Sequence, residues 1–183
     1  FDLTGPGAVA FADYLAVNKV DVDVGRAVYT PWLTPGGGFH SDLTMMRLGK
    51  NHVRVVTGAF DGGRDAFWMR KHMPRDGSVT VTDATRQMCT IGLWGPNAPV
   101  VLNLLTDASL DQHGSPYGWV VDAEVAGVSC QLFRISYVGD TGWEIYTSWE
   151  DGPTLWDALW ETGRDHGIVP VGIGVYGLTG RIE

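Results

Sequence analysis

Ten residues in the second half of the chain read Tyr137-Val138-Gly139-Asp140-Thr141-Gly142-Trp143-Glu144-Ile145-Tyr146. Apolar and polar residues alternate on both sides of the glycines, and this period of two is typical of half-buried strands. Glycine readily supplies the positive φ angles of a tight reversal. The pattern therefore predicts two antiparallel strands, over 128–137 and 143–147, joined by a turn.

Glu144 falls on the opposite face of the second predicted strand from Trp143 and Ile145. A carboxylate among aromatic residues needs a partner once it is buried, because burying it unpaired is costly. Two interpretations stay open from the residues alone. Glu144 either faces solvent on an edge hairpin, as most strand carboxylates do, or is buried with a partner.

The composition limits the class of protein. The 183 residues are 44% hydrophobic and 19% charged, which allows one large domain or two small lobes with a real core. The net charge of −8 argues against nucleic acid as a partner, because neutralising phosphates requires clustered Lys and Arg. Eight tryptophans are many, and we expect most in the core and some around a ligand cavity. No apolar run reaches the roughly 18 residues of a membrane span, so no membrane partner is predicted.

The cysteines and histidines indicate little redox or metal chemistry. Cys89 and Cys130 lie in apparent strands and form no C-x-x-C pair, so we expect reduced core residues in a cytoplasmic chain. The five histidines lack metal-ligand spacing, and neither cysteine has a histidine nearby in sequence. No metal site and no covalent catalysis are predicted.

A weak internal repeat divides the chain. Segments beginning at Leu3 and Leu93 share the pattern hydrophobe-x-Gly-Pro-x-Ala followed by an apolar helix. Each copy is predicted to open one half, about 1–92 and 93–183; chance similarity of two helix starts is the alternative. In the first copy, we expect Pro6 in the first helical turn with Thr4 as its cap. Both ends of the chain look cut, so we expect a fragment of a longer protein.

The order of the predicted elements indicates the fold class. Strand-like segments occur in groups joined by short turns, which favours antiparallel sheets. A helix is expected after Asp151, with Gly167 as its C-terminal cap and a buried stripe of Leu155, Trp156, Leu159 and Trp160. Strands and helices do not alternate as in a parallel dinucleotide-binding sheet. The predicted class is α+β, with two packed antiparallel-sheet subdomains and few amphipathic helices.

Asp42 is a second candidate carboxylate. It follows the glycine-rich turn Gly36-Gly37-Gly38, and glycines let a backbone or a ligand come close to a strand. A carboxylate there could accept hydrogen bonds from a cationic amine or tune a proton transfer. The alternative is a turn aspartate that bonds its own backbone.

Several segments together resemble the folate-binding domain of the aminomethyltransferase family. That family includes the T-protein of the glycine cleavage system and the C-terminal halves of dimethylglycine and sarcosine dehydrogenases. Four segments carry the match: 3–8, 29–44, 93–98 and 137–145. The ending, 174–183, is similar to a family segment G-x-x-x-L-x-x-L-R-x-E. In order and spacing they cover nearly the whole chain, and together they are specific.

The resemblance implies the fold of that family and tetrahydrofolate as the cofactor. Glu144 matches the family glutamate that accepts hydrogen bonds from the amino group and ring N–H of the pterin, as a carboxylate can from two donors at once. Asp42 matches the catalytic aspartate near the reactive N5 nitrogen of folate. Tyr29 and Tyr137 match tyrosines of the folate pocket. The implied reaction moves a one-carbon unit from an amine-borne carrier to tetrahydrofolate, by positioning and charge stabilisation.

Two departures from the family pattern affect the expected branch. Tyr176 stands where T-proteins have an Arg that meets the folate tail, so the chain looks more like the dehydrogenase-linked branch, with Tyr176 as a cofactor-binding residue. Gly180 replaces the expected Leu before Arg181, which would weaken local packing. The branch implies a flavin (FAD) domain upstream, and the family implies a further C-terminal domain and a small amine or methyl donor.

Two other functions of the same fold stay open. One is a folate-binding module without catalysis, as in relatives that serve iron–sulfur assembly. The other is a tetrahydrofolate-dependent demethylase acting on a methyl-sulfonium or aryl methyl ether. Asp42 favours the transferase, because a pure binder needs no catalytic carboxylate.

Overall fold

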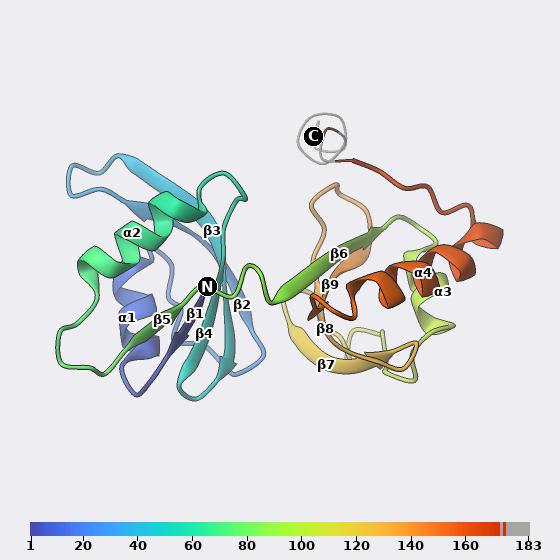
Figure 1. The fold of residues 1–183 in the computed structure, drawn as a ribbon, viewed down its shortest axis with the longest axis horizontal. Helices are drawn as coiled ribbons and strands as arrows, with labels where there is room; N and C mark the ends of the chain where they lie inside the picture. The colour runs from blue at the N-terminus through green and yellow to red at the C-terminus, as the bar shows by residue number, and fades with distance from the viewer. Residues whose placement is uncertain (173, 175–183) are drawn as a thin grey trace. The chain divides into compact units, whose positions relative to one another are not determined.

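The computed structural model describes residues 1–172 and residue 174. The chain divides into two units, one spanning Phe1–Thr85 and the other beginning at Arg86. Each unit contains one antiparallel sheet (Figure 1). The boundary precedes the division near residue 92 suggested by the repeat, because strand β6 (Met88–Trp94) pairs with a strand of the second unit.

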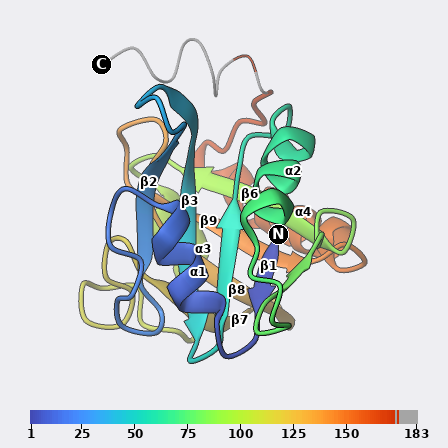
Figure 2. The same ribbon diagram turned by 90° about the vertical axis from the view of Figure 1, so that its left-hand side faces the viewer.

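The first unit is a five-stranded antiparallel sheet in the order β2-β3-β4-β1-β5. Helices α1 (Ala8–Leu15) and α2 (Gly62–His72) cover one face of it (Figure 2). The strands are β1 (Asp2–Thr4), β2 (Ala27–Leu33), β3 (Phe39–Gly49), β4 (His52–Val56) and β5 (Thr80–Thr82).

The start of α1 differs in detail from the prediction. The helix begins at Ala8, Gly7 is its N-cap residue, and no side chain caps it. Thr4 cannot be the cap because it is the last residue of β1, and Pro6 precedes the first helical turn. The helix buries the expected face, with an apolar residue at each position of an i, i+3, i+4, i+7 stripe: Ala8, Phe11, Ala12 and Leu15.

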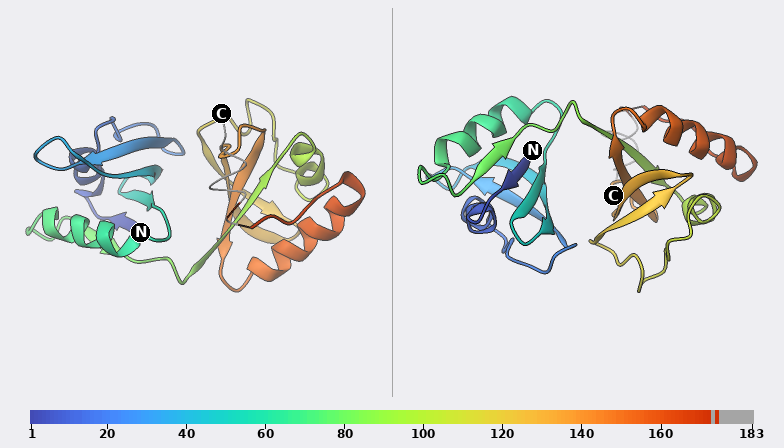
Figure 3. Two further views of the ribbon diagram at one scale, coloured as in Figure 1. Left: turned by 90° about the horizontal axis from the view of Figure 1, so that it is seen from above. Right: turned by 60° about the horizontal axis from the view of Figure 1, so that its bottom comes forward.

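The second unit is a four-stranded antiparallel sheet in the order β6-β9-β8-β7. Helices α3 (Ala98–Asn103) and α4 (Gly152–Gly163) lie on one face of it (Figure 3). The other elements are β7 (Val120–Val125), β8 (Val128–Arg134), β9 (Gly142–Ser148) and the short 3-10 helix η1 (Arg164–His166).

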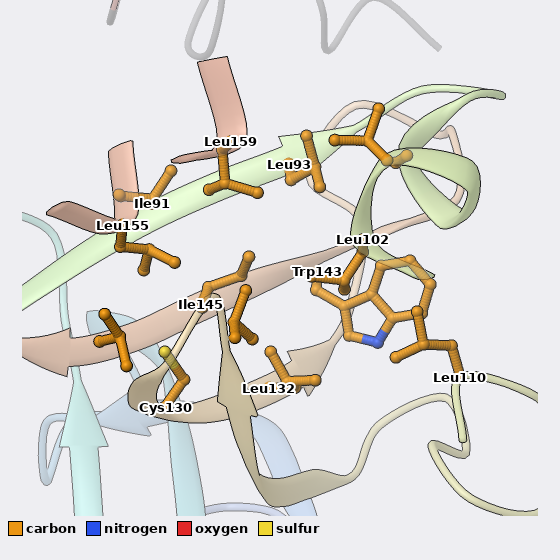
Figure 4. Packing of buried hydrophobic residues seen from close by; sticks show 14 residues of the cluster. Ile91, Leu93, Leu102, Leu110, Cys130, Leu132, Trp143, Ile145, Leu155 and Leu159 are labelled. Atoms are coloured by element: carbon orange, nitrogen blue, oxygen red, sulfur yellow. The ribbon is translucent and has the colours of Figure 1, made fainter. Parts of the chain in front are cut away.

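The core of the second unit lies between its helices and its sheet. Figure 4 shows Leu155 and Leu159 of α4 above Ile145, in the same cluster of buried side chains as Ile91. Trp156 is 45% exposed, so its predicted place in the buried stripe of α4 is wrong. The buried stripe of α4 is narrower than expected and consists of Leu155 and Leu159 with the glycines Gly152 and Gly163. Gly167 follows η1 with the positive φ expected of a C-terminal cap.

The segment 128–147 forms the predicted pair of antiparallel strands, with Arg134 opposite Trp143. However, β8 ends at Arg134, so residues 135–141 form a loop rather than a tight turn, and Tyr137 is not in a strand. Beyond the last strand pair, the carbonyl of Ile135 accepts a hydrogen bond from the indole N–H of Trp94 over 2.9 Å.

The internal repeat is visible in the backbone. At both starts, the amide of the alanine bonds the carbonyl of the glycine over 3.0 Å, in the pairs Ala8–Gly5 and Ala98–Gly95. The strand order is shared as well, since β7-β8-β9-β6 of the second sheet matches β2-β3-β4-β1 of the first. Chance similarity of two helix starts does not explain a common order of four strands.

Both cysteines are free thiols that pack in the second unit. Burial raises the pKa of each thiol, which keeps both in the neutral form. Within residues 1–172 and 174, no helix has the length and apolar character required to cross a membrane.

Candidate functional site

Glu144 lies on β9, which pairs with β6 on one side and β8 on the other. Its chain neighbours Trp143 and Ile145 point into the core beneath the helices (Figure 4). Successive strand residues point to opposite faces, so the predicted separation of Glu144 from these two is confirmed. The edge-hairpin alternative is wrong, because β9 is an inner strand and Glu144 is half-buried.

Aromatic residues neighbour Glu144 on its own face of the sheet. The hydroxyl of Tyr146 donates a hydrogen bond to Oε2 of Glu144 over 2.5 Å. Phe133 lies directly opposite Glu144 on β8. The side chains of Tyr146 and Phe133 are both buried. A carboxylate such as that of Glu144 can accept hydrogen bonds from several donors at once. Sequence analysis missed Tyr146, although the i, i+2 spacing on a strand places it on the same face as Glu144.

Trp94 occupies the surface on the other side of Glu144. Its strand, β6, places Gly92 opposite Glu144. A Cβ atom at position 92 would lie 2.3 Å from Cη2 and 2.4 Å from Cζ3 of Trp94, so the indole covers the glycine. Gly92 is exposed and Trp94 is half-buried. Sequence analysis expected some tryptophans near a cavity but did not single out this one.

Tyr137 lies in the loop between β8 and β9 and is 37% exposed. Its loop begins at Ile135, which the indole of Trp94 holds. The loop ends at Gly142, where a Cβ atom would lie 2.1 Å from the carbonyl oxygen of Leu93, so only glycine allows this approach to β6. Tyr137 and Glu144 therefore belong to the same end of the second sheet.

Asp42 lies on β3 of the first unit, with its Cα opposite Pro31 of β2. The hydroxyl of Tyr29 donates a hydrogen bond to Oδ2 of Asp42. Both side chains are exposed. The turn-aspartate alternative is wrong, because Asp42 is inside a paired strand and its partner is a tyrosine hydroxyl. The structure thus brings together two of the residues that the sequence singled out.

A buried network lies behind Asp42. Ser41 points to the other face of β3 and donates to Oδ2 of Asp65 on α2 over 2.9 Å. Asp65 is fully buried, and the hydroxyl of Thr57 also donates to it. Nε2 of His40 lies 3.5 Å from Oδ1 of Asp65; burial lowers the pKa of His40 and Asp65 opposes this shift. The network fastens the strand of Asp42 to α2.

The predicted site residues that the structure describes are divided between the two units. Asp42 and Tyr29 belong to the first unit, and Glu144 and Tyr137 belong to the second. Tyr176 lies outside the described residues. Across the part of the chain that the structure describes, no group of three or more His, Cys, Asp and Glu side chains could hold a metal ion.

Residues 1–182 match the family described as the GCVT N-terminal domain. The chain belongs to this family. An aminomethyltransferase from Halalkalibacterium halodurans is 35% identical to this GCVT domain over 174 residues, which are 94% of the chain and 47% of that protein. A 4-methylaminobutanoate oxidase (formaldehyde-forming) from Paenarthrobacter nicotinovorans is 32% identical over 168 residues, 92% of the chain and 20% of that protein. The GCVT domain thus spans less than half the length of these relatives.

Solved structures share the fold of this GCVT domain. The glycine cleavage system aminomethyltransferase T from Bartonella henselae superposes with a TM-score of 0.79 at 22% identity, over 96% of this chain and 45% of that one. The heterotetrameric sarcosine oxidase from Corynebacterium sp. U-96 gives a TM-score of 0.69 at 16% identity, over 93% and 82%. The likeness confirms the predicted class of two antiparallel sheets with few helices.

Proposed function

We propose that this GCVT domain binds tetrahydrofolate and serves the transfer of a one-carbon unit from an amine donor to it. The observation that carries the proposal is the position of Glu144, half-buried on an inner strand with Tyr146, Phe133 and Trp94 around it. Membership of the GCVT N-terminal domain family supports it, as does the similarity to aminomethyltransferases.

The chemistry of a reduced pterin suits this carboxylate. The pterin edge has an exocyclic amino group beside a ring N–H, and a carboxylate accepts two parallel donors well. Rings beside the carboxylate exclude water from a flat ligand and strengthen each hydrogen bond. Tyr146 holds Oε2 of Glu144 in place, which orients the carboxylate before the ligand arrives.

Asp42 is assigned to the reacting end of the ligand. In the proposed transfer, nitrogen N5 of tetrahydrofolate attacks the iminium carbon of the donor, and N10 then displaces the donor amine from that carbon. The amine leaves with the protons of N5 and N10, and positive charge is carried at the reacting atoms during the transfer. A carboxylate beside them stabilises that charge and orients the amine. The hydrogen bond from Tyr29 supports this role, because it fixes the direction of an otherwise exposed side chain.

We further place the domain in a longer flavin-linked amine dehydrogenase or oxidase of the cytoplasm, with a methylated amine as donor. Tyr176 supports this, since T-proteins have Arg at that position. The 32% identity to a 4-methylaminobutanoate oxidase is in keeping with it. The sequence of the residues before Phe1 tests this placement: a flavin-binding glycine motif there is the expected result, and its absence overturns the placement alone.

Replacement of Glu144 tests the proposed function. In the intact protein, Glu144→Ala is expected to abolish measurable binding of tetrahydrofolate in titration calorimetry. Glu144→Gln should weaken binding by about 10- to 100-fold or more, because hydrogen bonds to a charged group contribute about 1.5–3 kcal/mol each. Glu124→Gln, an exposed glutamate on β7 of the same sheet, is the matched control. Unchanged affinity in Glu144→Ala would remove Glu144 from the site.

A further inference from the structure

We propose that Trp94 forms an aromatic wall of the ligand site beside Glu144 and makes the site selective for a fused bicyclic ring. The inference rests on the proposed function, because Glu144 is taken to bind the edge of that ring. The inference goes beyond the proposed function because it names Trp94 as the side chain on which the face of the ligand ring stacks.

The indole of Trp94 is held in one position from three directions. Beneath it, a Cβ atom at Gly92 would lie 2.3–3.0 Å from three of its ring carbons. At its edge, a Cβ atom at Gly142 would lie 2.7 Å from Cδ1. Its N–H donates to the carbonyl of Ile135 over 2.9 Å. The ring therefore lies flat on two glycines of neighbouring strands and has its only donor satisfied.

This arrangement places an apolar plane next to a carboxylate. Gly92 and Glu144 are cross-strand partners, and residues opposite each other have Cβ positions about 4.5–5.5 Å apart. A flat ligand stacked on the indole would therefore present its edge to the Glu144 carboxylate. Gly92 has no side chain that could come between the two.

A wall fixed in advance favours binding. An ordered side chain loses little rotamer freedom when a ligand arrives, so more of the contact energy appears as affinity. Stacking of a heterocyclic base on an aromatic side chain changes affinity by about 5- to 150-fold on replacement with alanine. The gain scales with the stacked area, so it should be larger for two fused rings than for one.

The test compares two probes that share a donor edge in the intact protein. Tetrahydropterin without a tail has two fused rings, and 2,6-diaminopyrimidin-4-one has one. In titration calorimetry, Trp94→Leu should weaken the binding of tetrahydropterin by about 5-fold or more and weaken the binding of the pyrimidine less. The dissociation constant of the pyrimidine divided by that of tetrahydropterin should therefore fall. Trp94→Phe should keep most of the ratio because a phenyl ring also stacks.

Gly92→Ala provides an independent variant, because the added Cβ displaces the indole while tryptophan remains. It should lower the ratio as Trp94→Leu does, and it replaces that variant if Trp94→Leu fails to fold. Trp149→Leu, which removes a 66% exposed tryptophan from the same unit, is the matched control and should leave the ratio unchanged.

The outcomes separate the two proposals. Equal weakening of both probes in Trp94→Leu and Gly92→Ala would make Trp94 a structural residue and overturn the inference. Unchanged binding of both probes in these variants would overturn it as well. If the wild type binds neither probe, this inference fails; if Glu144→Ala also leaves tetrahydrofolate binding unaltered, the proposed function fails with it.

Discussion

Tyr29 and Asp42 meet because of strand register rather than nearness along the chain. Tyr29 is paired with Thr44, and Asp42 lies two residues away from Thr44 on the same face of β3. A diagonal neighbour on an antiparallel pair is within reach of an aromatic side chain. The resulting hydrogen bond gives an exposed carboxylate a defined direction.

Asp42→Asn tests the assigned chemistry at this pair. The variant should keep tetrahydrofolate binding but form methylene-tetrahydrofolate at least about 100-fold more slowly, since a charged group beside the reacting atoms is lost. Tyr29→Phe should slow the reaction less because the carboxylate remains. Product formation is followed in the intact protein with its amine donor, and Asp157→Asn on the exposed face of α4 is the control. Full turnover in Asp42→Asn would contradict the catalytic role and leave Asp42 a structural residue.

The two acids could be found from the sequence, whereas their surroundings could not. Asp42 and Glu144 stand out by type and by their glycine-rich flanks, and a family resemblance gives each a role. Tyr146 follows from strand alternation once Glu144 is chosen. The position of the Trp94 indole depends on a missing side chain at Gly92 and on the carbonyl of a loop residue, Ile135, which no periodic pattern encodes.

At the scale of elements, charged side chains link the short strand β1 to β4. Nε and Nη2 of Arg54 on β4 contact the two carboxylate oxygens of Asp2 at 2.8 and 3.2 Å, and Nε2 of His52 lies 3.2 Å from Oδ1. Burial alone would raise the pKa of Asp2, but hydrogen bonds from His52 and Arg54 outweigh it and hold the pKa far below its usual range. The ionised form of Asp2 therefore stabilises the fold.

Asp2→Asn should lower the free energy of unfolding by about 2–3 kcal/mol at pH 7. A depressed pKa contributes stability above the unfolded value of about 3.9, and this is lost as the pH falls towards the folded value. The gap between the wild type and Asp2→Asn should therefore narrow below about pH 4 in urea unfolding.

Asp21→Asn is the control for this pair, because Asp21 also contacts an arginine of the first unit but is 64% exposed. An exposed pair contributes only about 0–1 kcal/mol, so this variant should unfold nearly as the wild type does. A gap for Asp2→Asn that is constant from pH 7 to pH 3 would contradict the assignment of the stability to the ionised carboxylate.

Element types were predictable from periodicity, and element ends were not. The alternation over 128–137 continues past Arg134, yet the strand stops where a side chain takes over the carbonyl of Ile135. Likewise, an i, i+3, i+4 pattern on α4 indicates a buried stripe but not its width, so Trp156 was placed inside it in error. Both differences arise from tertiary contacts that override local preference.

At the scale of the whole chain, the repeat offers a matched pair of glycines. Gly5 and Gly95 have φ angles of 113° and 128°, which side chains rarely adopt. A Cβ atom at Gly5 would lie 2.4 Å from the carbonyl oxygen of Ser78, whereas one at Gly95 meets nothing within 4 Å. The difference reflects the additional strand β5, which follows Ser78 in the first unit.

Gly95→Ala should therefore lower the free energy of unfolding by about 1–3 kcal/mol through backbone strain alone. Gly5→Ala should cost more, because a backbone carbonyl cannot give way as a flexible side chain can. Hydrogen exchange at the amides of β1 and β4, and of β6 and β9, measures the two effects separately. Equal losses of protection in both variants would show that the approach of Ser78 does not matter.

The repeat also explains how far the organisation of the chain could be predicted. The Gly-Pro pattern correctly marks two equivalent helix starts, but it lies at the end of the strand that opens each copy. A boundary drawn at the pattern therefore falls inside β6, whereas strand pairing places it between Thr85 and Arg86. Pairing between strands that are distant in sequence depends on the whole sheet, so it cannot be predicted from the repeated pattern alone.

The shared strand order also lets the two copies be compared position by position. Asp2 opposite Arg54 in one sheet occupies the place that Gly92 opposite Glu144 occupies in the other. In the first copy, Asp2 and Arg54 form an ion pair, so the charge of the acid is neutralised by the chain itself. In the second, glycine stands across from the acid and supplies no countercharge. The two copies have thus diverged at one cross-strand pair, which joins an acid to an arginine in the first sheet and a glycine to an acid in the second.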